Sequence, residues 1–332
     1  MDFAIVPEVP TTPAEGTGID SIIRQTRKAE DLGYTGCFMP DHYVFEEIGT
    51  LRPDRPTYDA FMTLAIVAQH TTNMKLVTHV ACAIFRHPAM HARLFAQIDE
   101  ASGGRAIAGI GAGWTKAEFE IMGIDFPDVS ERLKMMDEQI EIMRGLWNEE
   151  TFDYDGTYYQ IKDAPCLPKP VQFGGPPIML GGSGKGILRR AGRYADILHM
   201  VPQTGKQGTT TPEEIKKLTD DALVDKLALV REEEAKAGRP VGSVKFATTV
   251  FNLIFTGSAS ESADTAAGVG SLFGLEGPDV LRHPALLIGT PEEMVDEMKR
   301  RNEKHGLELV GIHPGSDEGL ERFGREVLPK LV

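Results

Sequence analysis

The carboxylate of Asp41 and the imidazole of His42 are adjacent in the chain, at a position where they could transfer a proton. Asp41 and His42 directly follow the apolar segment 37–39, which is predicted to be a buried strand. In α/β folds the reacting groups lie just past the C-terminal ends of parallel strands. An imidazole suits this task because it exchanges protons near neutral pH. The same dipeptide could instead form a turn in which Asp41 caps backbone donors and His42 is solvated, and the residues alone leave both interpretations open.

A first glycine-rich loop, Gly-Ile-Gly-Ala-Gly-Trp at 109–114, follows a predicted strand. Trp114 stands where a dinucleotide-binding G-x-G-x-x-G loop needs its last glycine, which excludes that fingerprint. Glycines such as Gly111 and Gly113 would still let the backbone approach a flat ligand closely. The alternative is a tight corner of a barrel. Trp114 is predicted either to line the substrate pocket or to pack against the neighbouring helix.

A second glycine-rich loop precedes a predicted helix and has the composition of a phosphate site. It consists of Gly181, Gly182, Ser183, Gly184 and Lys185. Small residues at a helix start leave backbone N–H groups directed at one place, and the hydroxyl and ammonium groups add a donor and a positive charge. A Walker A loop is excluded because its first glycine and its Ser/Thr are missing. A plain helix start is the alternative.

Other histidines are weaker candidates. His87 and His91 are four residues apart on a predicted helix, but the glutamate of H-E-x-x-H and a third ligand are missing, so no metal site is predicted. His87 and the proline after it indicate a helix start. His199 ends a predicted strand and is interpreted either as part of the substrate pocket, near His42, or as a core histidine. The sequence contains no G-x-S-x-G motif, which argues against an α/β-hydrolase.

Alternating strands and helices must position these residues. The predicted strands are continuous apolar runs, as expected for strands buried on both faces of a parallel sheet. They span residues 3–6, 36–39, 75–80, 105–110, 178–180, 197–200, 246–254 and 309–312. Thr211 and Thr290, each followed by Pro and Glu, predict helix starts with capping boxes, and Ser130 predicts another. This pattern predicts a single (β/α)8 barrel over residues 1–332, with a doubly wound sheet as the alternative.

Three connections are longer than a barrel requires: 149–175, 200–210 and 256–289. The first is predicted to contain a short hairpin that turns at Asp155 and Gly156. Long loops at the catalytic end of a barrel usually shape or cover the substrate pocket. The segment 256–289 is therefore predicted to be a substrate-covering insertion within the barrel domain.

The composition limits the classes of function. A net charge of −14 argues against broad contact with nucleic acid or anionic membrane. Cys37, Cys82 and Cys166 show no C-x-x-C spacing and are predicted to be reduced core residues. No apolar run reaches about 18 residues, and the N-terminus lacks the basic region of a signal peptide. We therefore expect a cytoplasmic protein that acts on a small molecule.

Taken in order, the motifs resemble the luciferase-like monooxygenase superfamily, the bacterial-luciferase type of (β/α)8 barrel. The matching segments extend over essentially the whole chain and are 40–43, 85–89, 99–105, 109–114, 181–184, 193–196 and 325–329. The chain looks most like the branch that uses coenzyme F420, a deazaflavin. The resemblance implies an oxidoreductase that transfers a hydride between F420 and a small organic substrate. The alternatives are an FMN-dependent monooxygenase, which uses reduced flavin and oxygen, and a non-catalytic barrel that binds a flavin or another ligand.

The resemblance also implies roles for individual residues. His42 corresponds to a histidine that exchanges a proton with the substrate, and Asp41 to its acidic neighbour at the cofactor ring. His79 and Val80 correspond to a bulge in which the family often has a non-prolyl cis peptide supporting that ring. The two glycine loops correspond to regions that hold the side chain and phosphate of the cofactor.

One position departs from the family pattern. In the sugar-phosphate dehydrogenases of the family, a catalytic glutamate stands where this chain has Trp114. A glucose-6-phosphate-type substrate is therefore not implied. Members of the family are often homodimers, so the resemblance implies a homodimer here.

Overall fold

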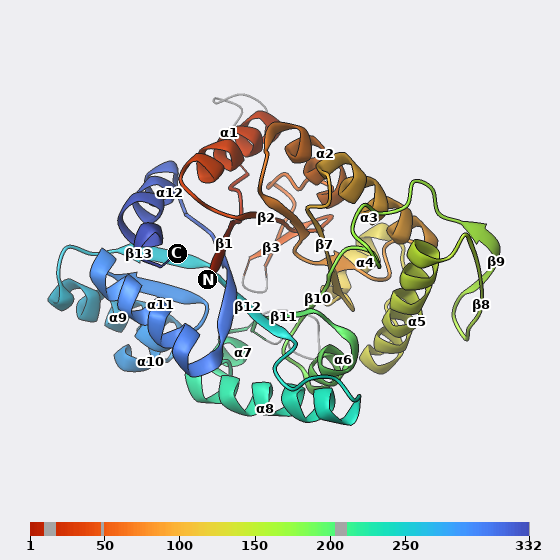
Figure 1. The fold of residues 1–332 in the computed structure, drawn as a ribbon. Helices are drawn as coiled ribbons and strands as arrows, with labels where there is room; N and C mark the ends of the chain where they lie inside the picture. The colour runs from red at the N-terminus through yellow and green to blue at the C-terminus, as the bar shows by residue number, and fades with distance from the viewer. Residues whose placement is uncertain (10–17, 48–49, 203–210, 332) are drawn as a thin grey trace.

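The computed structural model describes residues 1–9, 18–47, 50–202 and 211–331. Within them, eight parallel strands close into a barrel, and Figure 1 shows the ring of helices around it. The strands, in order around the barrel, are β1 (Asp2–Ile5), β2 (Gly36–Met39), β5 (Lys75–Thr78), β7 (Ala106–Gly111), β10 (Ile178–Gly181), β11 (Ile197–Met200), β12 (Lys245–Val250) and β15 (Leu307–Ile312). β15 pairs with β1 and closes the ring. The predicted (β/α)8 barrel is confirmed.

One helix packs outside the barrel after each strand. In chain order these helices are α1 (Gly18–Asp31), α2 (Ala60–His70), α3 (Pro88–Ser102), α5 (Val129–Asn148), α6 (Lys185–Tyr194), α8 (Asp220–Lys236), α11 (Pro291–His305) and α12 (Asp317–Arg322). Two short helices, α4 (Lys116–Met122) and α7 (Pro212–Lys216), lie in the connections before α5 and α8. The chain ends in a π-helical turn, Phe323–Val327, and a 3-10 turn, Leu328–Lys330.

Helix starts follow local capping rules, with two corrections. His87 caps α3 by accepting the backbone N–H of Ala89, and Thr290 forms a capping box with Glu293 at the start of α11, as predicted. Thr211 caps α7, but the described contacts at this helix start do not include the reciprocal bond of the predicted capping box. The prediction from Ser130 was wrong: α5 begins at Val129, because Asp128 takes the N-cap position and places Ser130 inside the first turn. The apolar residues Met136, Ile140, Met143 and Leu146 form the buried face of α5.

Two apolar layers support the strands. Alternate residues of the strands face the helices in one large core cluster. The other residues fill the barrel, among them Ala4, Phe38, Val77, Met179 and Ala247. Because the inside of the barrel is packed in this way, a ligand has to bind at the strand ends rather than within the barrel. Cys37, Cys82 and Cys166 are buried free thiols, as predicted.

The predicted strand 246–254 is two strands. β12 ends at Val250, and β13 (Asn252–Phe255) leaves the barrel to pair with β14 (Leu286–Gly289). The partner changes at Phe251, whose backbone N–H donates to the Ala285 carbonyl, and a continuous apolar run gives no sign of such a change. β13 and β14 form a small separate core with α9 (Ala259–Phe273) and α10 (Gly277–Arg282). In Figure 1 this unit lies beside α11 and α12; its predicted role of covering a substrate stays a prediction.

The other long connections are partly described. The predicted hairpin is confirmed: β8 (Thr151–Asp155) pairs antiparallel with β9 (Gln160–Pro165). β3 (Phe45–Glu47) and β4 (Thr50–Arg52) form a further antiparallel pair after β2. Most of the connection 200–210 lies outside the described residues. Among the described helices, none is long and apolar enough to cross a bilayer.

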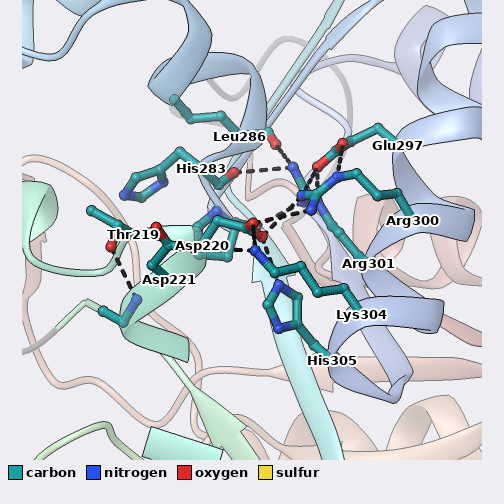
Figure 2. Close-up of polar contacts among 12 residues, drawn as sticks. Thr219, Asp220, Asp221, His283, Leu286, Glu297, Arg300, Arg301, Lys304 and His305 are labelled. Carbon is teal, nitrogen blue, oxygen red and sulfur yellow. Dashed lines mark hydrogen bonds and ion pairs between the residues drawn. The ribbon is translucent and has the colours of Figure 1, made fainter. Parts of the chain in front are cut away.

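An ion-pair network joins α8 to α11 on the outside of the barrel (Figure 2). Asp220 accepts both terminal nitrogens of Arg300, at 3.0 and 2.9 Å, and Nζ of Lys304 and Nε2 of His305, each at 2.6 Å. Arg301, which is buried, donates to the Leu286 carbonyl and so ties α11 to the 256–289 segment. Small cavities of about 70 and 10 Å³ adjoin Asp220, between α8, α10 and α11. The smaller one is lined by Phe246 and Leu307, near the N-terminal ends of β12 and β15, which is the end of the barrel opposite to His42.

Candidate active site

Asp41 is buried just past β2 and is held by an ion pair with the half-buried Arg86. Its two oxygens accept Nη1 and Nη2 of Arg86 at 2.7 and 2.9 Å, and Oδ2 also accepts the backbone N–H of Cys82 at 3.2 Å. Arg86 additionally pairs with Asp59, the N-cap of α2, and lies over the ring of Phe61. Asp41 therefore ties the end of β2 to the segment after β5, and its contacts are structural.

His42 forms an acid–histidine pair with Glu118, a residue of α4. Glu118 Oε2 lies 3.2 Å from Nδ1 of His42, and the Glu118 side chain is 3 % exposed. Its Oε1 accepts the backbone N–H groups of Tyr43 and of Val44, the latter at 3.1 Å. A carboxylate can only accept, so Nδ1 of His42 carries the hydrogen and Nε2 carries the lone pair of the neutral ring. The Trp114 ring packs against the same imidazole at nearly a right angle, with ring centroids 5.6 Å apart.

The sequence interpretation missed Glu118 for a physical reason. Thr115 and Glu118 have the T-x-x-E spacing of a capping box, which normally turns the glutamate back to its own helix. Here Thr115 makes no capping bond from its side chain, and its hydroxyl is buried without a partner among the described residues. Glu118 reaches across to the segment after β2 instead. The signal in the sequence that could have indicated Glu118 was a capping-box spacing directly after a glycine loop at a strand end.

The two glycine loops pack around the segment 78–80. The His79–Val80 peptide is cis, as the family resemblance implied. A Cβ atom at Gly111 would lie 2.7 Å from Cγ2 of Val80, and one at Gly181 would lie 2.8 Å from the same atom. Gly113 has a φ of +78°, a conformation that L side chains rarely adopt. These glycines thus make room for Val80 at the strand ends, and the approach to a ligand predicted for them stays a prediction.

The second glycine loop has the features of an anion site. Ser183 is 2 % exposed, and its hydroxyl has no hydrogen-bond partner among the described residues. Gly184 occupies the N-cap of α6 and leaves the helix start without a side-chain cap. Lys226 of α8 donates to the Ser183 carbonyl at 2.7 Å, and burial and the charge of Lys185 lower its pKa. A helix N-terminus, an unpartnered hydroxyl and two lysines therefore meet at one place.

Three more histidines occupy the same end of the barrel or the layer beneath it. His79 directly follows β5, and His199 of β11 is 1 % exposed, so His199 is a core residue under His79 rather than part of the rim. His313, after β15, pairs with Glu8, after β1, at 2.6 Å. His91 is buried on α3, away from the strand ends. The described residues contain no group of three His, Cys, Asp or Glu side chains that could hold a metal.

These features define a barrel protein with a histidine–carboxylate pair, and a glycine loop that has the features of an anion site, at the C-terminal ends of its strands. The sequence model of the luciferase-like monooxygenase family matches residues 1–267, and the chain belongs to this family. F420-dependent glucose-6-phosphate dehydrogenase from Amycolatopsis mediterranei is 26% identical, over 96% of each chain. The enzyme of that name from Microbacterium testaceum is 29% identical, over 91% of this chain and 90% of its own.

A further sequence relative is named for a flavin, and two solved structures are similar in fold. The FMNH2-dependent dimethylsulfone monooxygenase of Pseudomonas putida is 27% identical over 73% of this chain and 70% of its own. The F420-dependent tetrahydromethanopterin reductase of Methanopyrus kandleri superposes with a TM-score of 0.73 at 21% identity, covering 100% of this chain and 99% of its own. An F420-dependent secondary alcohol dehydrogenase bound to an F420–acetone adduct superposes with a TM-score of 0.76 at 20% identity, with the same coverage. These structures establish the shared fold.

Proposed function

We propose that the protein is an F420-dependent oxidoreductase that transfers a hydride between the deazaflavin and a small organic substrate. One observation carries the proposal: a histidine backed by a buried carboxylate, His42 with Glu118, lies at the same end of the barrel as the anion site at Ser183. The first supplies proton transfer, and the second supplies a place for a phosphorylated cofactor. Relatives that align along almost the whole chain are named for F420.

The residues of the anion site fit the phosphate of the cofactor. The unpartnered hydroxyl of Ser183 and the backbone N–H groups at the start of α6 would donate to phosphate oxygens. Lys185 and Lys226 would neutralise its charge. The ring would then lie over the segment 78–80, between the two glycine loops. When bound, the deazaflavin supplies the hydride chemistry, while the protein supplies orientation and electrostatics.

His42 would exchange the proton of the substrate at Nε2. Glu118 holds the opposite nitrogen, so that it fixes the tautomer and stabilises the imidazolium that forms. The catalytic role predicted for Asp41 becomes one of positioning, because Arg86 and Cys82 occupy its oxygens. Trp114, packed against His42, would form a wall of the substrate pocket. His199 would reach a bound molecule only through His79.

The remaining expectations concern the assembly. We propose a cytoplasmic homodimer that acts on a small molecule, with no nucleic-acid or membrane partner, as the family resemblance and the net charge of −14 imply. Sedimentation equilibrium of the purified chain tests the dimer. A concentration-independent mass of a single chain would contradict it.

Titration of the protein with oxidised F420 and, separately, with FMN tests the cofactor by changes in absorbance. We expect saturable binding of F420 and at least tenfold weaker binding of FMN. Ser183→Ala and Lys226→Ala should each weaken F420 binding about tenfold or more, because each removes a hydrogen bond or charge contact to an anion. Lys236→Ala, at the far end of α8, is the matched control and should leave the affinity unchanged. Tight FMN binding without F420 binding would instead favour the monooxygenase alternative.

A further inference from the structure

Inside the strand ends, His79, His199 and Thr249 form a three-membered hydrogen-bonded cluster. The two Nε2 atoms of the histidines lie 3.1 Å apart. Oγ1 of Thr249 lies 2.9 Å from Nε2 of His199 and 3.1 Å from Nε2 of His79. Phe38 stacks on the His79 ring at 4.7 Å and meets the His199 ring edge-on at 5.9 Å. His199 of β11, Thr249 of β12 and His79, which follows β5, thus form one polar cluster packed against Phe38 of β2.

The short contacts determine which nitrogens carry hydrogen. Nδ1 of His199 is not one of the buried unpartnered atoms of the described residues. Burial lowers the pKa of His199, whereas the backbone of Thr248 raises it, which is the effect of a carbonyl that accepts a ring hydrogen; because Nε2 faces the cluster, we assign this contact to Nδ1. A backbone carbonyl can only accept, so the hydrogen of His199 is on Nδ1 and its Nε2 presents a lone pair. A second lone pair facing it at 3.1 Å would be repulsive. His79 therefore carries its hydrogen on Nε2, and its own lone pair is on Nδ1.

That lone pair is accessible. Nδ1 of His79 has no hydrogen-bond partner among the described residues, and it is not one of their buried unpartnered atoms. His79 itself is half-buried, whereas His199 behind it is buried. The hydrogen bonds of Nε2 hold the His79 ring in place while Nδ1 can accept a proton. If Nδ1 takes up a proton, Nε2–H becomes a charge-assisted donor to His199 and Thr249.

We propose that His79 is a second proton acceptor of the site and takes, at Nδ1, the ring proton that a reduced deazaflavin loses when its hydride leaves. The N–H bond of the cofactor ring breaks, its electron pair stays in the ring, and a new N–H bond forms on His79. The hydride goes to the substrate, whose own proton comes from His42. A hydride transfer of this kind moves two protons, and the strand ends hold one histidine for each. That the proton comes from a deazaflavin ring rests on the proposed function. That Nδ1 of His79 is a proton acceptor does not rest on it.

The surrounding charges bear on this role. Burial, and then the charges of His199, His42 and His313, lower the pKa of His79, so the ring is neutral at neutral pH and would hold an added proton only transiently. His42 is paired with Glu118 and His313 with Glu8. A proton on His42 disfavours a proton on His79, because the two positive charges repel each other. The state in which one of the two histidines is protonated is therefore favoured over the state in which both are.

Nitrogen-15 NMR of histidine-labelled, ligand-free protein at pH 7 tests the assignment. We expect His79 protonated at Nε2 and unprotonated at Nδ1, and the opposite tautomer for His199. His79→Gln and Thr249→Val identify the resonances: Gln keeps a donor to His199 but removes the Nδ1 lone pair, whereas Val removes only the hydroxyl. A His79 that carries its hydrogen on Nδ1 would overturn the proposal, whatever the cofactor.

Cofactor binding gives an independent measurement. An acceptor at Nδ1 favours the reduced ring, which carries the N–H group, over the oxidised one. His79→Gln should therefore reduce the ratio of oxidised to reduced F420 dissociation constants about fivefold, the equivalent of one ordinary hydrogen bond. Thr249→Val, the control that retains Nδ1, should leave the ratio within twofold. An unchanged ratio in His79→Gln would refute the role toward the ring, and failure to bind either form would refute the proposed function while the NMR result still decides the acceptor.

Discussion

Replacing Glu118 with glutamine separates the two contacts that this carboxylate makes. Glutamine keeps an oxygen that can accept the backbone N–H groups of Tyr43 and Val44, so the segment after β2 should keep its conformation. It removes the negative charge 3.2 Å from Nδ1 of His42. We expect the fold to be retained and the proton affinity of His42 to fall.

The magnitude follows from the geometry. A hydrogen bond to a charged group contributes about 1.5–3 kcal/mol, and the buried position of Glu118 limits screening by solvent. The protonated form of His42 should lose about that much stabilisation, which lowers its proton affinity about tenfold to a hundredfold. Glu118→Ala should lose the same interaction and in addition leave two backbone donors unpaired, at a cost of about 1–3 kcal/mol each in the free energy of unfolding.

NMR titration of the His42 ring in wild type and Glu118→Gln measures the first effect, and urea unfolding of the glutamine and alanine variants measures the second. Glu120→Gln, an exposed residue of the same helix paired with Lys116, is the matched control and should change neither. If His42 titrates identically in wild type and Glu118→Gln, Glu118 does not position the histidine, and the acid–base pair is no part of the mechanism.

Three further outcomes are expected. His42→Ala should abolish turnover once a substrate is known, while F420 affinity measured by absorbance stays within a few-fold; undiminished turnover would remove His42 from the mechanism. Arg86→Ala should lower the free energy of unfolding by about 3–5 kcal/mol in urea, because it leaves Asp41 charged and buried without its partner; a loss below about 1 kcal/mol would contradict a buried pair. Asp220 should stabilise the fold mainly above pH 4: burial raises its pKa, but hydrogen bonds from Arg300, Lys304 and His305 outweigh burial and hold the pKa well below its usual range. Since the folded-state pKa lies below the unfolded value of about 3.9, this stability is present above that value and is lost as the pH falls through the folded pKa. The difference in unfolding free energy between wild type and Asp220→Asn should therefore shrink from pH 5 to pH 2, and a difference that grows on acidification would refute this.

Local patterns predicted most of the scaffold. The eight buried strands and the caps at His87 and Thr290 are encoded by nearest neighbours in the chain, because apolar runs and capping residues act over one turn or one strand. The change of strand partner after Val250 was not predictable, since the apolar run continues through it while the hydrogen-bond partner changes from β15 to β14.

The sequence by itself determined that a titratable pair and two glycine loops follow the strands of a barrel, and strand order alone brings such positions to one end. Only the tertiary structure decided what they touch. It turned Asp41 to Arg86, gave His42 its partner Glu118, and placed Lys226 at the second glycine loop. It also brought His79, which follows β5, and His199, on the non-adjacent strand β11, to within a hydrogen bond of each other. These contacts join residues far apart in the chain, and their directions depend on how each side chain packs once the barrel has closed.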